Sequence, residues 1–379
     1  MQYVLAVFFF WVSLYLYYPT LSVYVQTKTS DLARVGTVLA MYGFGQMAVR
    51  IPLGMISDWF TRKKPLILAG FLLSGIGALI MANAGGYAAL LIGRAVTSLS
   101  ASFWVVLVVV FSRLFPPEEA VRATATLTLV NTLGRLVGTG LTGWLNDAGG
   151  YTLAFYVAVG ISVLAAVLML PGKERTSSYL SPSMTTLKNL LKRQDIMVPS
   201  WLSVISQYMV YASTFGFIPI LAARFGASNV MLSMLMVMNL VIVIIGNLLV
   251  TRLVSRFPAS LLIVSSFIAL SLGLVLAGLA QSLTMIFIAQ ALIGASNGIN
   301  YPTLMGLSIE QVDLSERSTA MGIHQSVYAI GMFAGPWLSG ILADFSGIGT
   351  MFIVTGIVCL LISLFGIKIL SRIQTNNKI

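Results

Sequence analysis

Long apolar stretches separated by short polar or glycine-rich breaks run the whole length of the 379-residue chain. A helix needs about 20 consecutive apolar residues to cross the hydrocarbon of a bilayer, where every backbone polar group must be satisfied within the segment. We therefore expect an all-α integral membrane protein. The pattern predicts twelve transmembrane helices, at residues 2–25, 35–57, 65–83, 86–110, 122–145, 151–170, 197–222, 229–254, 259–280, 283–308, 318–343 and 348–370.

The composition supports this conclusion, because 58% of the residues are hydrophobic and only 9% are charged, with a mean hydropathy of +0.94. Soluble domains carry about 25% charged residues, and a soluble fold could not hide so much apolar surface. The N-terminal stretch lacks the basic start and small-residue cleavage site of a secretory signal, so we expect it to form the first span. The lone Cys359 excludes an internal disulfide and is expected to be a small buried residue.

Basic residues collect on one side of the predicted bilayer, and only Lys28, Arg34 and Arg224 fall on the other side. Because basic loops stay in the cytoplasm, the pattern predicts a multi-pass protein of the cell (plasma or inner) membrane with both termini inside. No basic stripe with interleaved aromatic residues occurs, so a nucleic-acid partner is not expected. The cytoplasmic set holds 16 of the 22 basic residues: Arg62, Lys63, Lys64, Arg113, Arg122, Lys173, Arg175, Lys188, Lys192, Arg193, Arg252, Arg256, Arg317, Lys368, Arg372 and Lys378.

The two halves of the sequence resemble one another. Residues 134–157 align without gaps with residues 331–354, and residues 11–21 match residues 211–221 through a shared serine, a shared proline and aromatic partners. Span five therefore mirrors span eleven and span one mirrors span seven, which implies a two-fold axis along the membrane normal and a site between two like halves. The identities in the longer alignment include Gly134/Gly331, Gly138/Gly335, Gly143/Gly340, Asp147/Asp344, Gly150/Gly347 and Phe155/Phe352.

One long polar connection divides the predicted spans six and six. We predict an N-terminal six-helix bundle at residues 1–172, a cytoplasmic linker at residues 173–196 and a C-terminal six-helix bundle at residues 197–379. Within the linker, the segment LKNLLKR at residues 187–193 is either solvated or an amphipathic helix that lies on the anionic inner leaflet.

A short turn, GMISDWFTRKK at residues 54–64, places one carboxylate and three cations between two apolar runs. It resembles the cytoplasmic signature Gly-x3-Asp-x3-Arg-Lys of the major facilitator superfamily, with Trp59 in place of a usual basic residue and Thr61 in place of a usual glycine. Residues 114–124 resemble that family's loop between spans four and five, and residues 90–96 its arginine-bearing fourth span. The signature positions are occupied by Gly54, Asp58, Arg62 and Lys63.

The resemblance covers the whole chain and implies a fold of two pseudo-symmetric six-helix bundles. It also implies a monomeric carrier without a cofactor, which moves a small solute by alternating access as the two halves rock. The resemblance makes the turn a latch of the outward-facing state, in which Asp58 can face the positive N-terminal end of span eleven and Arg62 can pair with Asp58. The alternative is a charge cluster that only sets topology. The implied gating residues are Gly54, Asp58, Arg62, Arg113 and Arg122.

Three arginines lie within predicted spans two, four and five: Arg50, Arg94 and Arg135. A charge near the bilayer centre costs at least about 2.5–3.5 kcal/mol, so each should face a polar cavity or a partner. The spans of the N-terminal half offer no midplane acid to pair with them. A guanidinium that faces water can grip a carboxylate or phosphate with two hydrogen bonds. The preferred cargo is therefore a small organic anion or a zwitterion with an acidic group.

Polar and aromatic residues within the spans complete the predicted substrate cavity. Each of them is alternatively an interhelical hydrogen-bonding residue. The substrate-binding candidates beside the arginines are Tyr15, Tyr18, Gln46, Asn131, Gln207, Tyr211, Asn239, Asn297, Asn300, Tyr301, Gln325 and Tyr328.

Proton coupling usually needs a titratable group within the membrane, and the sequence offers three candidates: His324, Glu310 and Asp344. A histidine titrates near neutrality when it is unperturbed, but a lone histidine is often a structural hydrogen-bonding group. H⁺ is thus a candidate coupling ion, and exchange or facilitated movement of an anion is an alternative.

Other functions stay open on the sequence. Multidrug or metabolite efflux by a proton antiporter is the main alternative, although it favours membrane acids that this chain lacks. The run MLSMLMVM at residues 231–238 offers thioethers to Cu(I), so a copper importer is a minor alternative, yet methionine also fills gaps in apolar helices. A non-transporting receptor or assembly factor is a further alternative, but the sequence outside the predicted spans offers no signalling domain. No nucleophile–base pair, metal-ligand set or phosphate-cradling loop occurs, so we expect neither an enzyme nor a metal site.

Overall fold

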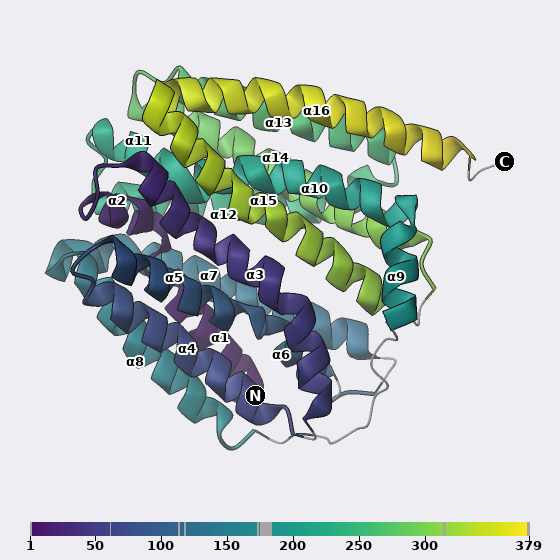
Figure 1. Ribbon diagram of the computed structural model, residues 1–379, viewed down its shortest axis with the longest axis horizontal. Helices are drawn as coiled ribbons and strands as arrows, with labels where there is room; N and C mark the ends of the chain where they lie inside the picture. The colour runs from purple at the N-terminus through teal and green to yellow at the C-terminus, as the bar shows by residue number, and fades with distance from the viewer. Residues whose placement is uncertain are drawn as a thin grey trace. The chain divides into compact units, whose positions relative to one another are not determined.

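The computed structural model describes residues 2–60, 62–112, 114–116, 119–172, 174, 184–313 and 316–376. All regular structure within these ranges is helical, and every predicted span corresponds to one helix or to consecutive helical pieces (Figure 1). The first six spans are α1 (Gln2–Tyr15) with η1 (Tyr18–Thr20) and α2 (Leu21–Gln26), α3 (Leu32–Trp59), α4 (Lys64–Ala82), α5 (Tyr87–Ser102) with α6 (Trp104–Ser112), α7 (Ala120–Gly149) and α8 (Tyr151–Met169).

The remaining spans follow a short additional helix, α9 (Met184–Lys192). They are α10 (Gln194–Ala212) with the π-helical turn η3 (Ser213–Phe217) and α11 (Ile218–Arg224), α12 (Asn229–Leu253), α13 (Ala259–Gly278), α14 (Leu283–Glu310), α15 (Arg317–Ser346) and α16 (Ile348–Asn376).

Ten helices of the described ranges are long and apolar enough to cross a membrane. Helices α3 and α7, with 28 and 30 residues, are also long enough to cross a membrane. Many large hydrophobic side chains are exposed on the helices; Leu248 of α12, for example, is 68% exposed. The chain is therefore a multi-pass membrane protein, as the hydrophobic pattern predicts.

The helices form two compact units. The first comprises residues 1–30, 44–181 and 228–234, and the second comprises residues 31–43, 182–227 and 235–379. The start of α3 therefore belongs to the second unit, and the start of α12 belongs to the first.

Spans one and seven are interrupted at matching places. Pro19 lies at the start of η1 and Pro219 at the start of α11. Proline has no amide hydrogen and disfavours an α conformation in the residue before it. The matched prolines of the sequence repeat thus lie where each long helix changes its hydrogen-bonding pattern, and the side chains around these two breaks include most of the aromatic candidates.

Glycines bring α7 and α15 against these interrupted spans. In the first unit, a Cβ atom at Gly134 or Gly138 of α7 would lie 2.6 Å from a carbonyl oxygen of α1. In the second unit, a Cβ at Gly335 of α15 would lie 2.5 Å from the carbonyl oxygen of Tyr208 on α10. Since a backbone oxygen cannot yield as the end of a side chain can, only glycine allows these helices to approach so closely.

Part of the linker packs against the second unit. Leu190 of α9 is only 2% exposed and packs with Ile196, Val312 and Ala320. The guanidinium of Arg193 lies 2.7 Å from the carboxylate of Asp195, and this hydrogen bond raises the pKa of Arg193 above its usual value. For this segment the sequence allows a solvated linker or an amphipathic helix; the structure has a helix, with Leu190 covered by protein.

Candidate functional site

Two arginines and two tyrosines form a layered cluster within the first unit, here called the arginine–tyrosine stack. The break between α1 and η1 turns the rings of Tyr15 and Tyr18 onto one another, with their centroids 4.6 Å apart and their planes only 10° from parallel. Arg94 lies over the Tyr18 ring, at 4.5 Å from the guanidinium carbon to the centroid, and Arg135 lies over the Tyr15 ring, at 4.6 Å. A cation therefore covers each end of a stacked phenol pair.

Arg94 is held deep in the protein by α5. Its side chain is only 2% exposed, and its Nη2 donates a hydrogen bond to the Tyr18 hydroxyl oxygen at 2.6 Å. Short charge-assisted hydrogen bonds of this kind are about twice as strong as neutral ones. Because Arg94 fixes the hydroxyl end and also lies over the ring of the same tyrosine, it determines where the whole stack lies.

Arg135 is the more accessible member of the stack. It comes from α7 and is half-buried, whereas Tyr15 beneath it is only 3% exposed. A guanidinium on an aromatic face gains about 0.5–2 kcal/mol from the cation–π contact. Arg94, at the other end of the stack, is only 2% exposed, so Arg135 is the more exposed cation of the two.

Two further candidates of the first unit, Arg50 and Asn131, lie outside the arginine–tyrosine stack. Arg50 of α3 is 7% exposed, and its Nη2 donates to the Oε1 atom of Gln46 at 2.5 Å, one helical turn earlier. Asn131 of α7 is half-buried, one turn before Arg135. Arg50 and Gln46 thus form a neighbouring pair of their own on α3.

The second unit contains neutral amides in hydrogen bonds between helices. The Nδ2 of Asn239 on α12 donates to the carbonyl oxygen of Gln290 on α14 at 3.1 Å. The Nδ2 of Asn300 on α14 donates to the hydroxyl of Ser266 on α13 at 2.8 Å. Both asparagines are buried, at 4% and 0% exposure. These two side chains join helices within the unit.

Aromatic candidates of the second unit gather in two groups. Tyr211 stacks with Tyr42 at 6.4 Å and lies 4.8 Å from Phe215, measured between ring centroids. Tyr301 and Tyr328 meet edge to face at 5.8 Å. The other candidates are accessible in part: Asn297 and Gln325 are half-buried, and Gln207 is 7% exposed.

His324 is completely buried on α15. Its Nδ1 lies 2.9 Å from the Ser200 hydroxyl and its Nε2 3.4 Å from the Ser203 hydroxyl, both on α10. Glu310, by contrast, is exposed at the end of α14. Asp344 is exposed at the end of α15, where its Oδ1 accepts a hydrogen bond from the Leu32 amide at 3.1 Å. The three candidates for proton coupling thus have separate environments.

The predicted gate residues are only partly described. Only the backbone is described at Gly54 and Asp58, and Arg113 lies outside the described residues. The predicted latch therefore stays a prediction. Arg62 is exposed. The neighbouring helix start is held by Glu174, whose carboxylate accepts from the Lys63 amide at 2.5 Å and from the Lys64 amide at 3.2 Å. A carboxylate at this place satisfies amides that α4 leaves unpaired and matches the helix dipole.

Three residues that contact candidate residues or helix ends are not among the candidates from the sequence. Gln290 is fully buried on α14, and its Oε1 accepts from the Thr214 hydroxyl at 3.3 Å. Tyr42 joins the Tyr211 group from α3. An amide or a phenol inside an apolar span indicates a polar contact within the membrane, so this signal identifies Gln290 and Tyr42 as further candidates. The capping role of Glu174 depends on a contact across 111 residues of sequence and has no local signal.

The methionine run on α12 does not present one face. Met231 and Met234 are 43% and 55% exposed, whereas Met236 is 1% exposed. Within the described residues, no group of three His, Cys, Asp or Glu side chains could hold a metal ion.

Comparisons with known proteins give matches along the whole chain. The model of the Major Facilitator Superfamily matches residues 3–221 and residues 200–378. An uncharacterised MFS-type transporter of Methanocaldococcus jannaschii is 21% identical over 345 residues, which are 88% of each chain. A chloramphenicol efflux pump of Mycobacterium tuberculosis is 28% identical over 155 residues, 40% of this chain and 37% of the pump. A solved bacterial homologue of the human lysosomal transporter Spinster has a TM-score of 0.83 at 16% identity, over 98% of this chain and 96% of that one.

Proposed function

Because the chain belongs to the Major Facilitator Superfamily, we propose that it is a secondary active transporter for a small organic anion, or for a zwitterion with a carboxylate or phosphate. The proteins of this family are carriers rather than enzymes. Arg135 is the observation that carries the proposal, since it brings a half-buried guanidinium to the exposed end of the arginine–tyrosine stack. A cation in a membrane span is costly unless it meets water or an opposite charge.

The two arginines of the stack have different roles in this proposal. Arg135 binds the acidic group of the cargo through paired hydrogen bonds. Arg94, at 2% exposure, does not reach the cargo but positions Tyr18 and, through the stacked rings, Tyr15 beneath Arg135. Arg94 is therefore a positioning residue, and the loss of either arginine should weaken anion transport for different reasons.

The transport cycle in this proposal is alternating access by a monomer of two six-helix halves, with both termini in the cytoplasm. The basic residues of the loops support that orientation. Asp58 would latch the cytoplasmic side in the outward-facing state, as the family signature implies. The buried hydrogen bonds of His324 favour a structural role for its ring, which leaves anion exchange as the simplest coupling for this carrier.

The test is uptake into proteoliposomes with and without a pH gradient, using small carboxylates, phosphate esters, alcohols and amines of matched size. We expect transport of the carboxylates or phosphate esters by the natural sequence. Arg135→Gln should lower that transport at least about tenfold, whereas Arg252→Gln, which removes an exposed arginine at the end of α12, should not change it. Accumulation of amines alone, or full activity of Arg135→Gln with the carboxylates, would refute the anion proposal.

Drug efflux is the second candidate function. It is favoured by the 28% identity to the chloramphenicol efflux pump, although that match covers only 40% of this chain. An efflux pump for neutral or cationic drugs should not depend on Arg135. Drug susceptibility of cells that express the natural sequence or Arg135→Gln separates the two: equal protection by both proteins would favour efflux over anion transport.

A further inference from the structure

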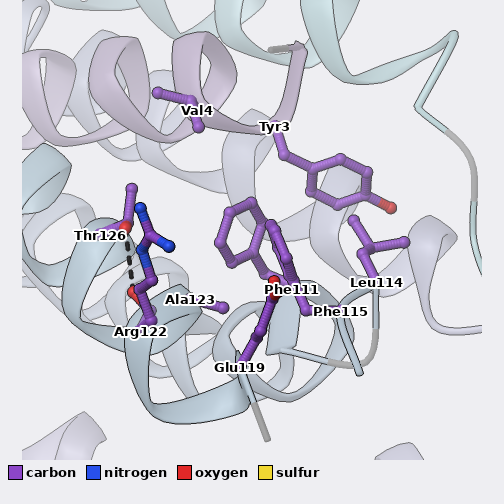
Figure 2. Close-up of a pocket in the computed structure, with 9 residues that line it drawn as sticks. All are labelled: Tyr3, Val4, Phe111, Leu114, Phe115, Glu119, Arg122, Ala123 and Thr126. Atoms are coloured by element: carbon purple, nitrogen blue, oxygen red, sulfur yellow. Dashed lines mark hydrogen bonds between the residues drawn. The ribbon is translucent and has the colours of Figure 1, made fainter. Parts of the chain in front are cut away.

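A cavity of about 320 Å³ lies in the first unit, where α1 and α7 begin and α6 ends (Figure 2). It is remote from the arginine–tyrosine stack, because Tyr3 at its wall precedes Tyr15 by three helical turns, or about 18 Å along the helix axis. Its volume is at the lower end of the range of ligand sites. The proposed binding of the cargo by Arg135 makes no use of this cavity. The lining consists of Tyr3, Val4, Phe111, Leu114, Phe115, Glu119, Arg122, Ala123 and Thr126.

Aromatic rings form one wall of the cavity. The ring centroids of Tyr3 and Phe111 are 6.1 Å apart, and those of Phe111 and Phe115 are 5.3 Å apart. Tyr3 and Phe111 are buried, and Phe115 is 36% exposed at the rim. In Figure 2 the Phe111 ring lies between Arg122 on the left and Tyr3 on the right. Aromatic faces attract ammonium groups through the cation–π interaction.

Two opposite charges complete the lining. Glu119 immediately precedes α7, and Arg122 is three residues further along; both are exposed. Within the described part of the chain, neither the carboxylate of Glu119 nor the guanidinium of Arg122 forms an ion pair or a hydrogen bond. A ligand that carries one anion and one cation would satisfy both groups, whereas a ligand with only negative charge would meet repulsion from Glu119.

Two exposed leucines of α7 follow the cavity residues on the same helical face. Arg122, Thr126, Leu129 and Leu133 follow one another at helical spacing on one face, and the two leucines are 59% and 44% exposed. The 30 residues of α7 span about 45 Å at 1.5 Å per residue, more than the roughly 30 Å of hydrocarbon. A helix of this length centred in the bilayer has its first turn at the level of the lipid headgroups, and Leu129 and Leu133 then lie beside the acyl chains.

We propose that this cavity binds the headgroup of a zwitterionic aminophospholipid of the ethanolamine type. Its phosphate pairs with Arg122, and its ammonium group binds Glu119 and the aromatic wall. One acyl chain lies along Leu129 and Leu133. The single guanidinium matches the single phosphate of such a lipid, and the carboxylate distinguishes it from anionic phospholipids. A soluble zwitterion would share the polar contacts but would gain nothing from the two leucines.

The test is native mass spectrometry of the full chain in mild detergent with phosphatidylethanolamine, phosphatidylcholine or phosphatidylglycerol of identical acyl chains. We expect tightest retention of phosphatidylethanolamine. Arg122→Gln and Glu119→Gln should each weaken that retention about tenfold, the loss expected of one charge-assisted hydrogen bond. Asp313→Asn and Arg252→Gln, which remove exposed charges at other helix ends, are the matched controls and should have no effect.

Three results would overturn the proposal. The first is preferred retention of phosphatidylglycerol, and the second is unchanged retention of phosphatidylethanolamine in both Glu119→Gln and Arg122→Gln. The third is displacement of the lipid by an equal concentration of soluble phosphoethanolamine, which would assign the cavity to a free zwitterion. Because both substituted side chains are exposed, the variants should fold, and gel filtration checks that they do. Transport by the natural sequence is not involved in any of these outcomes.

Discussion

Helices α7 and α15 occupy matching places in the sequence repeat and pack in the same way, yet they carry different chemistry. Gly138 of α7 approaches the carbonyl oxygen of Val12 within the first unit, and Gly335 of α15 approaches that of Tyr208 within the second. One residue after the first shared glycine, however, α7 has the half-buried Arg135 over an aromatic ring, and α15 has the buried Met332. The close backbone approach is thus common to both helices, whereas the cation belongs to one.

This difference separates two requirements that a duplicated carrier must meet. Close packing in lipid needs small residues at fixed spacing, and both copies provide them. Recognition of a charged solute needs an ionised group that the protein can stabilise within the membrane, and one copy is enough. On α15 the buried titratable group is instead His324, two helical turns before Met332, and its ring lies in hydrogen bonds to serine hydroxyls. We interpret the first half as the part that recognises the charged group of the cargo, and the second half as the part that offers neutral polar contacts.

The largest expected effect comes from breaking the shared packing. Gly138→Val and Gly335→Val each place a side chain 2.6 or 2.5 Å from a backbone oxygen, and such overpacking costs about 3 kcal/mol. Both variants should lose most of their folded protein, as measured by gel filtration and thermal unfolding in detergent. Gly160→Val on α8 is the control, because no atom lies within 4 Å of a Cβ at that position. Loss at only one of the two glycines would mean that the helices do not share a packing rule.

Removing the chemical difference should give the second largest effect. Arg135→Met gives α7 the residue that α15 has at the matching position, and it removes the proposed paired contact to the cargo. We expect kcat/KM for a transported carboxylate to fall about tenfold to hundredfold, the equivalent of about 1.5–3 kcal/mol for hydrogen bonds to a charged group. Folded yield should stay near that of the natural sequence. The reciprocal Met332→Arg in the Arg135→Met background should not restore transport, and a rescue would contradict the asymmetry.

A smaller effect should follow from disturbing the support beneath Arg135. Tyr18→Phe keeps the ring but removes the hydroxyl that accepts from Arg94 at 2.6 Å. Loss of one partner of a buried charged donor costs about 1–3 kcal/mol, so thermal stability should fall and KM for the carboxylate should rise. Tyr24→Phe is the matched control: its hydroxyl donates to the Met81 carbonyl at 2.8 Å, remote from any arginine. A rise in KM for both variants would show that the stack has no special role.

Much of this architecture is predictable from the sequence, because the bilayer imposes long apolar helices and the repeat shows which spans correspond. The prediction of a twelve-helix fold of the Major Facilitator Superfamily is confirmed. Pro19 and Pro219 already mark where spans one and seven change. Intramembrane arginines are visible in any single sequence as well, since their cost in hydrocarbon demands an explanation.

Contacts between distant side chains were not predictable in the same way. That Arg94 meets Tyr18 rather than an acid depends on how the short η1 turn directs a ring toward α5. Asn300 was a candidate for cargo binding by residue type, and nothing local indicates that Ser266 is its partner. Glycine spacing predicts that a helix packs closely but does not name the helix that it meets. Such pairings depend on the three-dimensional arrangement, and local patterns in a single sequence do not identify them.

The smallest expected effect concerns the ends of the two compared helices, where the similarity returns. Asp147 of α7 accepts a hydrogen bond from the Asn229 side chain at the start of α12, at 2.8 Å, and Asp344 of α15 accepts from the Leu32 amide at the start of α3, at 3.1 Å. A carboxylate near a helix N-terminus contributes about 0.3–1 kcal/mol. Asp344→Asn keeps an acceptor oxygen but removes the charge, so amide exchange at the start of α3 should accelerate only about two- to fivefold.

Hydrogen exchange measured by mass spectrometry in nanodiscs provides reciprocal controls for this last comparison. Asp344→Asn should accelerate exchange at the start of α3 and leave the start of α12 unchanged, and Asp147→Asn should do the opposite. Asp344→Ala, which also removes the acceptor for the Leu32 amide, should accelerate exchange further than Asp344→Asn. If both asparagine variants changed both helix starts equally, the two contacts would not be local caps, and the similarity between α7 and α15 would end at their glycines.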